Sequence, residues 1–142
     1  MAEAGEGFTL EVATPERLVV NERVNEAQIP GKDGYMGVLP GHAPLISELA
    51  NGVLSYTSGQ KTQYLAIHGG FVEILPDKVR VLADSAEKRE EIDIEGAREE
   101  LRRATEILED PPVDLDPANA LAEMKRAQAR VDTASQTQVV HQ

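Results

Sequence analysis

The 142-residue chain contains no cysteine, which excludes a disulfide framework and any chemistry that needs a thiolate. Aromatic residues are also scarce, with two phenylalanines, three tyrosines and no tryptophan. Because sugar-binding sites rely on aromatic rings for stacking, this composition counts against a sugar-binding protein. The lack of cysteine fits a reducing compartment.

Basic residues are few for the size of the chain. Fourteen Lys and Arg face 25 Asp and Glu, which gives a net charge of -11. A nucleic-acid-binding protein needs a basic face for the phosphates, and anionic lipid attracts basic segments. The charge therefore argues against nucleic acid and against direct membrane adsorption.

Long apolar runs are missing as well. None approaches the roughly 18 residues that a membrane-spanning helix needs. The first residues, MAEAGEGF, lack the basic and apolar regions of a secretory signal. We expect a soluble chain that meets a membrane only through other proteins.

The glycines divide the chain in two, since ten of the 11 lie at or before Gly70. Short runs with alternating apolar residues fill this first part, for example Phe8, Leu10 and Val12. Turn sequences such as IPGKDG, LPGHAP and LPDK separate them. Alternation between turns is typical of β-strands, and many short strands predict an antiparallel β-sandwich over residues 1–86.

The remaining residues, 87–142, change to a helical period. In two stretches, apolar residues recur at every third or fourth position, as on one face of a helix. The segment EDPPVDLDP separates the two stretches, because adjacent prolines cannot continue a helix. Asp93 and Asp116 are the predicted N-caps. The two stretches predict an antiparallel two-helix hairpin, and their apolar residues are Ile94, Ala97, Leu101, Ala104, Leu108, Ala120, Met124, Ala127, Val131 and Ala134. An alanine-rich seam buries little area, so the hairpin should depend on docking.

No catalytic constellation is visible. The three histidines, His42, His68 and His141, are far apart, with no pairing typical of a metal site. Ser47 follows His42, but the GxSxG motif of a nucleophile elbow is missing, and so is a GxxxxGK[ST] phosphate loop. The sequence thus indicates neither a hydrolase nor a nucleotide-hydrolysing enzyme.

The segment GYMGVLPGHAPLI, residues 34–46, holds one histidine among prolines and glycines. His42 could lock the loop by bonding to its backbone, could contact a partner, or could act as a base. Pro40 and Pro44 fix φ, while Gly41 allows unusual dihedral angles. A rigid loop of this kind suits docking at low entropic cost.

Three basic residues of the second helix, Lys125, Arg126 and Arg130, are open to two interpretations. Arg126 and Arg130 are four residues apart and therefore share a face. They either form an ordinary solvated face or bind an acidic partner segment or a phosphate.

Two segments resemble the epsilon subunits of F-type ATP synthases: GVLPGHAPLI and HGGFVEILPDKVRVLADSAE. The opening FTLEVATPERLVV fits as well, and the resemblance runs from Phe8 to about Thr133. It implies a sandwich of about ten strands followed by a helical hairpin. It also implies a non-catalytic rotor subunit that couples proton flow to ATP synthesis, with a hairpin that inhibits ATP hydrolysis in many bacteria.

The resemblance further implies the partners and the location. The partners are the gamma subunit, the c-ring, and the beta and alpha subunits of the catalytic head, with one copy of the chain per complex and no cofactor. The location is peripheral, on the cytoplasmic face of the bacterial inner membrane, with membrane contact only through the complex.

Residue roles follow by position. The turn Gly31, Lys32, Asp33 and Gly34 matches the region that faces the c-ring. The gamma-facing loop is matched by Gly37, Pro40, Gly41, His42, Pro44 and Leu45. Lys125, Arg126 and Arg130 are the candidates for contacts between the hairpin and the catalytic head.

One departure concerns ATP. Some bacterial members bind ATP on the hairpin through Ile or Leu, Asp, two residues, then Arg-Ala. Here Ile92, Asp93 and Ala97 are kept, but Gly96 replaces the arginine. An ATP-sensing module remains an alternative function, as does a free-standing ligand-binding sandwich.

Overall fold

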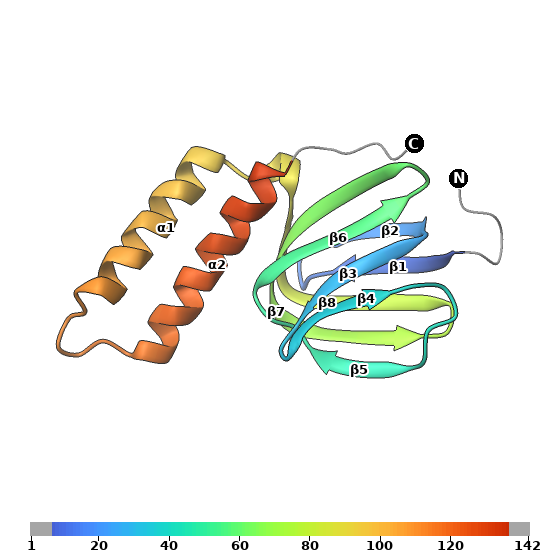
Figure 1. The fold of residues 1–142 in the computed structure, drawn as a ribbon, viewed down its shortest axis with the longest axis horizontal. Helices are drawn as coiled ribbons and strands as arrows, with labels where there is room; N and C mark the ends of the chain where they lie inside the picture. Colours follow the sequence, from blue (N-terminus) through green and yellow to red (C-terminus); the bar gives the residue numbers. More distant parts are fainter. Residues whose placement is uncertain (1–6, 137–142) are drawn as a thin grey trace.

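A computed structural model describes residues 7–136 of the chain (Figure 1). Eight strands come first, followed by one turn of 3-10 helix and two α-helices. The strands are β1 (Phe8–Ala13), β2 (Leu18–Val24), β3 (Glu26–Gly31), β4 (Gly34–Val38), β5 (Leu45–Glu48), β6 (Gly52–Ser58), β7 (Lys61–Leu75) and β8 (Lys78–Lys88). The helical part comprises η1 (Arg89–Glu91), α1 (Ile94–Glu109) and α2 (Pro117–Ser135). The predicted sandwich followed by a hairpin is confirmed.

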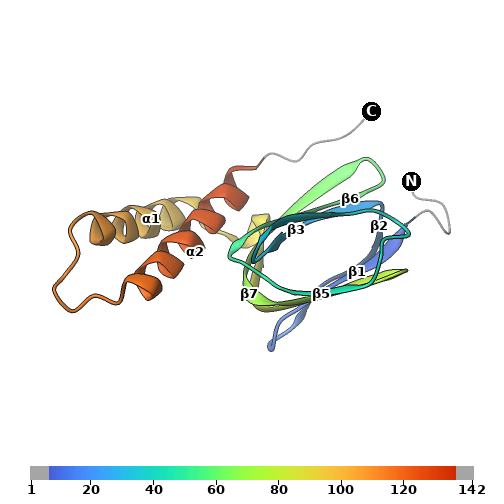
Figure 2. The ribbon, with the colours of Figure 1, turned by 60° about the horizontal axis from the view of Figure 1, so that its bottom comes forward.

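The strands pair in the order β2-β1-β8-β7-β6-β3-β4, and β5 pairs with β7. The sheet folds over on itself into two layers, one containing β1 and β5 and the other containing β3 and β6 (Figure 2). One pairing departs from the expected antiparallel pattern, because β1 runs parallel to β8. Parallel neighbours need a long connection, and here the chain from β2 to β7 provides it.

The two longest strands, β7 and β8, contribute to both layers of the sandwich. Residues 61–67 of β7 pair with β6, whereas residues 71–74 pair with β5. The bend lies at Gly69 and Gly70, both with positive φ, and a Cβ on Gly70 would clash with the carbonyl oxygen of Leu82. Only glycine adopts this conformation readily. Counting β7 and β8 once in each layer gives the expected strand number of about ten.

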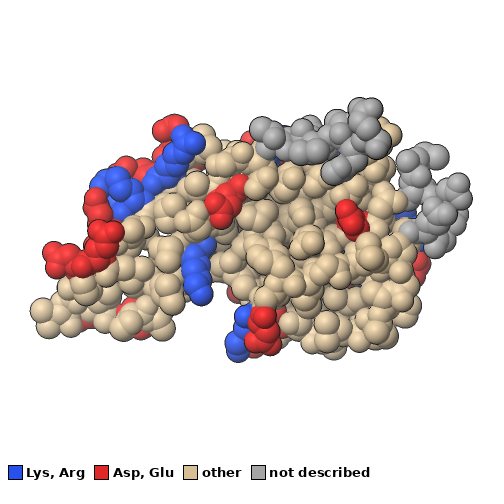
Figure 3. All heavy atoms as spheres, in the orientation of Figure 1, with Lys and Arg blue, Asp and Glu red and all other residues tan. Residues whose placement is uncertain are grey.

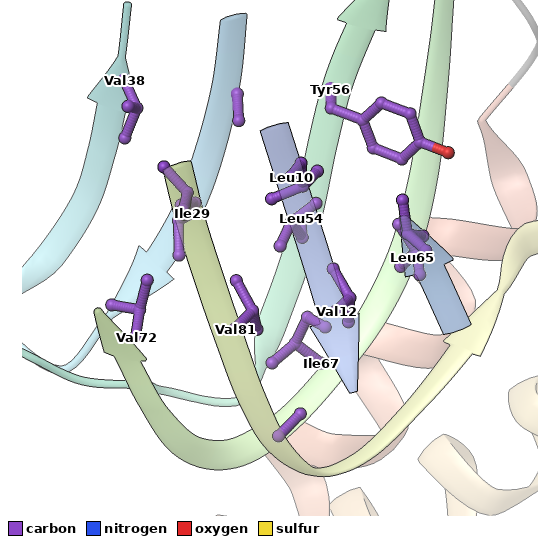
Figure 4. Packing of buried hydrophobic residues seen from close by; sticks show 14 of the residues in the cluster. Leu10, Val12, Ile29, Val38, Leu54, Tyr56, Leu65, Ile67, Val72 and Val81 are labelled. Atoms are coloured by element: carbon purple, nitrogen blue, oxygen red, sulfur yellow. The ribbon is translucent and has the colours of Figure 1, made fainter. Parts of the chain in front are cut away.

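The core lies between the layers and is built from the alternating residues (Figure 4). Leu10 and Val12 of β1, Val81 of β8 and Ile67 of β7 are almost fully buried. Burial of side chains of this size contributes about 1.5–3 kcal/mol each. The sandwich therefore has a core of its own, separate from the small cluster beneath the helices.

The junction between the two parts is short. The last strand ends at Lys88, and η1 begins at the next residue, so the change from strand to helix lies two residues beyond Ala86. Glu91 of η1 accepts hydrogen bonds from Arg17 (2.7 Å) and from the backbone of Lys88 (2.8 Å). These bonds to Arg17 and Lys88 lower the pKa of Glu91 to about 2. They fix the point from which the hairpin leaves the sandwich.

The helices α1 and α2 lie side by side and run in opposite directions (Figures 1 and 2). Asp116 caps α2 as predicted, because its carboxylate accepts from the backbone of Ala118 at 3.1 Å and of Asn119 at 3.5 Å. Asp93 occupies the N-cap position of α1, but its side chain makes no capping hydrogen bond. The predicted N-cap position is confirmed, but the side chain does not make the capping bond, and the Asp93 carboxylate lies close to Gly96.

Candidate functional site

The loop around His42 joins β4 to β5 and lies at the end of the sandwich away from the helices (Figures 1 and 2). His42 donates from Nδ1 to the carbonyl oxygen of Leu39 at 2.5 Å. Its ring also meets the ring of Phe8 edge to face, with 5.3 Å between centroids. The interpretation that His42 locks the loop backbone is confirmed. Gly41 has a φ of 79°, in the region that favours glycine.

This locked loop presents an open surface. Gly37, Pro40, Gly41, Pro44 and Leu45 are all exposed. Leu39 is exposed as well, although it was not among the predicted residues. The histidine thus fixes the loop from inside, while apolar side chains on either side of it face outward. This arrangement suits docking, because little conformational freedom remains to be lost.

The turn of Gly31, Lys32, Asp33 and Gly34 connects β3 to β4 and is held from the neighbouring strand. The backbone N–H of Lys32 donates to the carbonyl of Glu48 at 3.0 Å, and the Lys32 ammonium lies 3.0 Å from the Glu48 carboxylate. A Cβ at Gly31 would come within 2.8 Å of the carbonyl oxygen of Gly34. The tip residues Lys32 and Asp33 are exposed. The turn is thus a fixed, charged projection.

A row of exposed apolar residues crosses the outer face of the layer that contains β1 and β5. Phe71 of β7 lies directly opposite Leu82 of β8, and the row continues through Ala13 to Leu18 of β2. Ile46 of β5 is paired with Glu73, two residues along β7 from Phe71. The exposed fractions are 54% for Phe71, 50% for Leu82, 56% for Leu18 and 71% for Ile46. A contiguous exposed apolar patch marks an interaction surface.

This apolar row was not predicted from the sequence. The indication in the sequence was a large apolar residue at an outward-facing position of each strand. Phe71 is next to the buried Val72, and Leu82 is next to the buried Val81. A large apolar residue at an outward position is uninformative alone. Only the strand pairing brings four of them together.

The helix α2 packs on β6 and β7 and covers the outer face of that layer. Ala129 and Thr133 of α2 are almost completely buried. A second small cluster lies at the junction, where Ala66 of β7 packs with Ile92 and Ala97 and with the partly buried Val131 and Ala134. Most of these side chains are small, so docking of the hairpin rests on little apolar area.

An ion pair joins the hairpin to the sandwich. Arg130 of α2 donates to Glu87 of β8 from Nε at 2.9 Å and from a terminal nitrogen at 3.2 Å. A second terminal nitrogen lies 3.6 Å from Glu100 of α1. Arg130 is mostly buried, whereas Lys125 and Arg126 are exposed and form no ion pair within residues 7–136. The three predicted basic residues are therefore not equivalent: Arg130 is held by carboxylates inside the molecule, and the other two are exposed to solvent.

His68 of β7 lies next to this pair and is only 4% exposed. Its Nε2 is 3.6 Å from Glu87, too far for a hydrogen bond, and neither ring nitrogen is hydrogen-bonded within the described part of the chain. Burial, with further contributions from Arg126 and Arg130, holds the pKa of His68 below its ordinary value, and Glu87 offsets this only in part. The lowered pKa favours the neutral form of the imidazole at pH 7.

The residues of the degenerate ATP motif have structural roles here. Ile92 and Ala97 are buried in the cluster at the junction. Gly96 is exposed and provides no cation. Arg98, the next arginine along the helix, pairs with Glu95 at 3.0 Å.

No group of three or more histidine, aspartate or glutamate side chains is placed to hold a metal ion within residues 7–136. In the same range, no helix is long and apolar enough to cross a membrane. His141 lies outside the described residues.

Charge is distributed unevenly over the surface. In the view of Figure 3, acidic and basic side chains crowd along the hairpin, while the sandwich shows few. The α1 surface includes ion pairs between neighbouring turns, such as those of Arg102 with Glu99 and Glu106. Exposed pairs of this kind contribute little to stability. The sandwich thus carries fewer charged side chains than the hairpin on this face.

Comparisons with known proteins cover the same two parts. The profile described as ATP synthase, Delta/Epsilon chain, beta-sandwich domain matches residues 7–89, and the long alpha-helix domain of the same chain matches residues 90–135. The ATP synthase epsilon chain of Solibacter usitatus is 53% identical over 125 residues, which cover 88% of this chain and 93% of that protein. The ATP synthase epsilon chain of Moorella thermoacetica is 45% identical over 128 residues, covering 89% and 96%.

Two solved structures share the fold. A chain of the Euglena gracilis mitochondrial ATP synthase, OSCP/F1/c-ring, superposes with a TM-score of 0.79 at 24% identity, covering 92% of this chain and 82% of that one. A chain of the Tetrahymena thermophila mitochondrial ATP synthase central stalk/c-ring superposes with a TM-score of 0.61 at 12% identity, covering 90% and 96%. The profiles together span all but a few residues at each end, and the chain belongs to the ATP synthase delta/epsilon chain family.

Proposed function

We propose that this chain is the epsilon subunit of a bacterial F-type ATP synthase, a non-catalytic part of the central stalk. The observation that carries the proposal is the 53% identity, over 88% of the chain, to a protein named ATP synthase epsilon chain. The chain takes part in coupling proton flow to ATP synthesis by rotation. As part of the complex it lies at the cytoplasmic face of the inner membrane.

The sandwich is the part that docks. The exposed row of Phe71, Leu82, Leu18 and Ile46, together with the locked loop around His42, offers apolar surface to the gamma subunit. The turn of residues 31–34 offers charge, through Lys32 and Asp33, to the polar loops of the c-ring. A rigid sandwich with two different surfaces transmits torque between two partners, because neither surface has to rearrange on binding.

The hairpin is the part that regulates. It docks on the sandwich mostly through small side chains and one ion pair, so the docked and released states are separated by a few kcal/mol. When it is released, Lys125, Arg126 and Arg130 become available to an acidic segment of a beta or alpha subunit. Contact with the catalytic head would then slow ATP hydrolysis.

The experiment is reconstitution. The purified full chain is added to an ATP synthase catalytic sector depleted of its own epsilon subunit, and binding is followed by co-elution on gel filtration. We expect one chain to bind per complex. Failure to co-elute at micromolar concentration would contradict the proposal.

A further inference from the structure

His68 is placed where the hairpin meets the sandwich. Its neighbour Ile67 points into the core, whereas Ala66, two residues before His68, packs against the helical part. His68 therefore faces α2 and is covered in this docked arrangement. A buried imidazole without a hydrogen bond on either nitrogen is unusual, because burying an unpaired polar group costs free energy.

The charges around His68 come from three elements. From β8, the Oε1 atom of Glu87 lies 3.6 Å from Nε2 of His68 and accepts from Nε of Arg130 at 2.9 Å. From α2, Arg130 shares the Glu87 carboxylate, and the charge of the exposed Arg126 contributes to the lowered pKa of the imidazole. From α1, Glu100 reaches Arg130.

The other strands add little to this set. The strand β6, on the far side of β7, contains no Asp, Glu, Lys, Arg or His. The other charged residues at this end of β8, Asp84 and Lys88, are both exposed, and Asp84 lies over Gly69. With His68 neutral, two carboxylates and two guanidinium groups balance at this contact.

We propose that His68, Glu87 and Arg130 form a pH-sensitive latch, in which protonation of His68 releases the hairpin from the sandwich. Protonation adds a third cation to the balanced set while the hairpin is docked, in a place where water screens it only in part. Release removes Arg130 and Arg126 together with α2. Glu87 stays on β8 beside His68 and pairs with the imidazolium instead. The same Oε1 atom thus serves Arg130 in the docked state and His68 in the released state.

The direction of the pH effect follows from linkage. In the docked state, burial and the two arginines hold the pKa of His68 below its ordinary value. In the released state the ring meets water and its pKa returns to the ordinary value of about 6.5 or above. The released state therefore binds more protons, so docking is strongest above that pH and weakens as the pH falls through it. For one proton and a released-state pKa of about 6.5, the docking equilibrium constant falls by at most about tenfold between pH 7.5 and 5.5.

The regulatory meaning of this latch rests on the proposed function of the hairpin, but the docking equilibrium is a property of the isolated chain. Because the chain has no cysteine, two can be introduced for fluorescent dyes, Gln60→Cys on the sandwich and Ala118→Cys on α2, both at exposed positions. Energy transfer between the dyes then reports docking without any partner. We expect the ratio of docked to released molecules to fall between pH 7.5 and 5.5, by up to about tenfold.

Two variants separate the latch from a general effect of acid. In His68→Gln the response should vanish, since glutamine does not titrate. In His42→Asn, which changes the other described histidine at the opposite end of the sandwich, the response should persist. A constant ratio in the unsubstituted chain, or an unchanged response in His68→Gln, would overturn the proposal.

A second measurement keeps His68 in place, so it does not depend on whether a variant with a substitution at His68 folds. The imidazole proton of His68 is titrated by nuclear magnetic resonance in the full chain and in Ala129→Arg, which forces a large charged side chain into the buried contact between α2 and the sandwich. We expect His68 to titrate at a lower pH in the unsubstituted chain than in Ala129→Arg. Equal titration midpoints, with the hairpin released in the variant, would overturn the latch. Reconstitution with the catalytic sector tests the proposed function separately, so each can fail without the other.

Discussion

The carboxylate of Glu87 on β8 binds the guanidinium of Arg130 on α2 through two hydrogen bonds, of 2.9 Å and 3.2 Å. These residues are 43 positions apart and belong to the two different parts of the chain. Both are largely buried, so solvent screens the pair only in part. The surrounding contact is made mostly of small side chains, so this pair and the hydrogen bond from the Asn51 side chain to the Ala122 carbonyl (3.3 Å) are polar connections that hold the hairpin down.

Removal of the Glu87 charge tests this connection. In Glu87→Gln the arginine loses a charged acceptor in a partly buried place, which should weaken docking by about 1–2 kcal/mol. Energy transfer between dyes at positions 60 and 118 measures the change at pH 7.5. The control is Glu99→Gln, whose carboxylate pairs with Arg102 on the surface of α1. An unchanged docked fraction in Glu87→Gln would show that the pair does not hold the hairpin.

For the loop around His42, we expect substitution to affect the stability and binding of the chain and not a catalytic step. His42→Ala removes the hydrogen bond to the Leu39 carbonyl and the edge contact with Phe8, and should lower the free energy of unfolding by about 1 kcal/mol. It should also weaken binding to the depleted catalytic sector. Asparagine can place an N–H near the same carbonyl, so His42→Asn should recover part of the loss. Chemical denaturation and co-elution measure the two effects. Normal assembly with complete loss of turnover in the complex would instead indicate a chemical role for His42.

The apolar row predicts a binding defect without a folding defect. Phe71→Asp places a charge in the centre of the row, at a position that is 54% exposed in the free chain. Loss of a contact of this size should weaken binding to the depleted complex at least tenfold, while the melting temperature stays within a few degrees. Val113→Asp is the matched control, because Val113 is fully exposed in the loop between the helices. If Phe71→Asp and Val113→Asp bind equally well, the row is not the docking surface.

The altered ATP motif predicts weak or no nucleotide binding. Gly96 offers no cation, and Arg98 is paired with Glu95 on the helix surface. Equilibrium dialysis with labelled ATP should therefore show no binding at micromolar concentration. Micromolar or tighter binding would support the alternative of an ATP-sensing module. The comparison variant is Gly96→Arg, which restores the residue that the resemblance associates with ATP.

The sequence predicted the two-part fold because each part has its own period. The alternation of apolar and polar residues around Leu10 and Val12 indicates which side chains form the core. The prolines after Glu109 indicate where the chain breaks between the two helices. The locking role of His42 was also predictable, since a histidine among prolines and glycines has few partners other than nearby backbone. These features all depend on neighbours in the sequence.

The features that were missed depend on pairing across long distances. The apolar row exists only because Phe71 and Leu82 lie opposite each other on adjacent strands. The parallel pairing of β1 with β8 has no local signal either. Likewise, nothing near His68 in the sequence indicates that a helix some 60 residues later covers it, or that Arg130 shares its carboxylate neighbour.

The central claim is that the sandwich binds the stalk while the hairpin controls hydrolysis. The rate of ATP hydrolysis by an epsilon-depleted catalytic sector tests it most directly, after addition of either the full chain or a chain that ends at Lys88, the last residue of β8. We expect both to bind and only the full chain to slow hydrolysis. If both bind and hydrolysis slows equally, the hairpin is not the regulatory part. If neither binds, the assignment of this chain to the stalk is wrong.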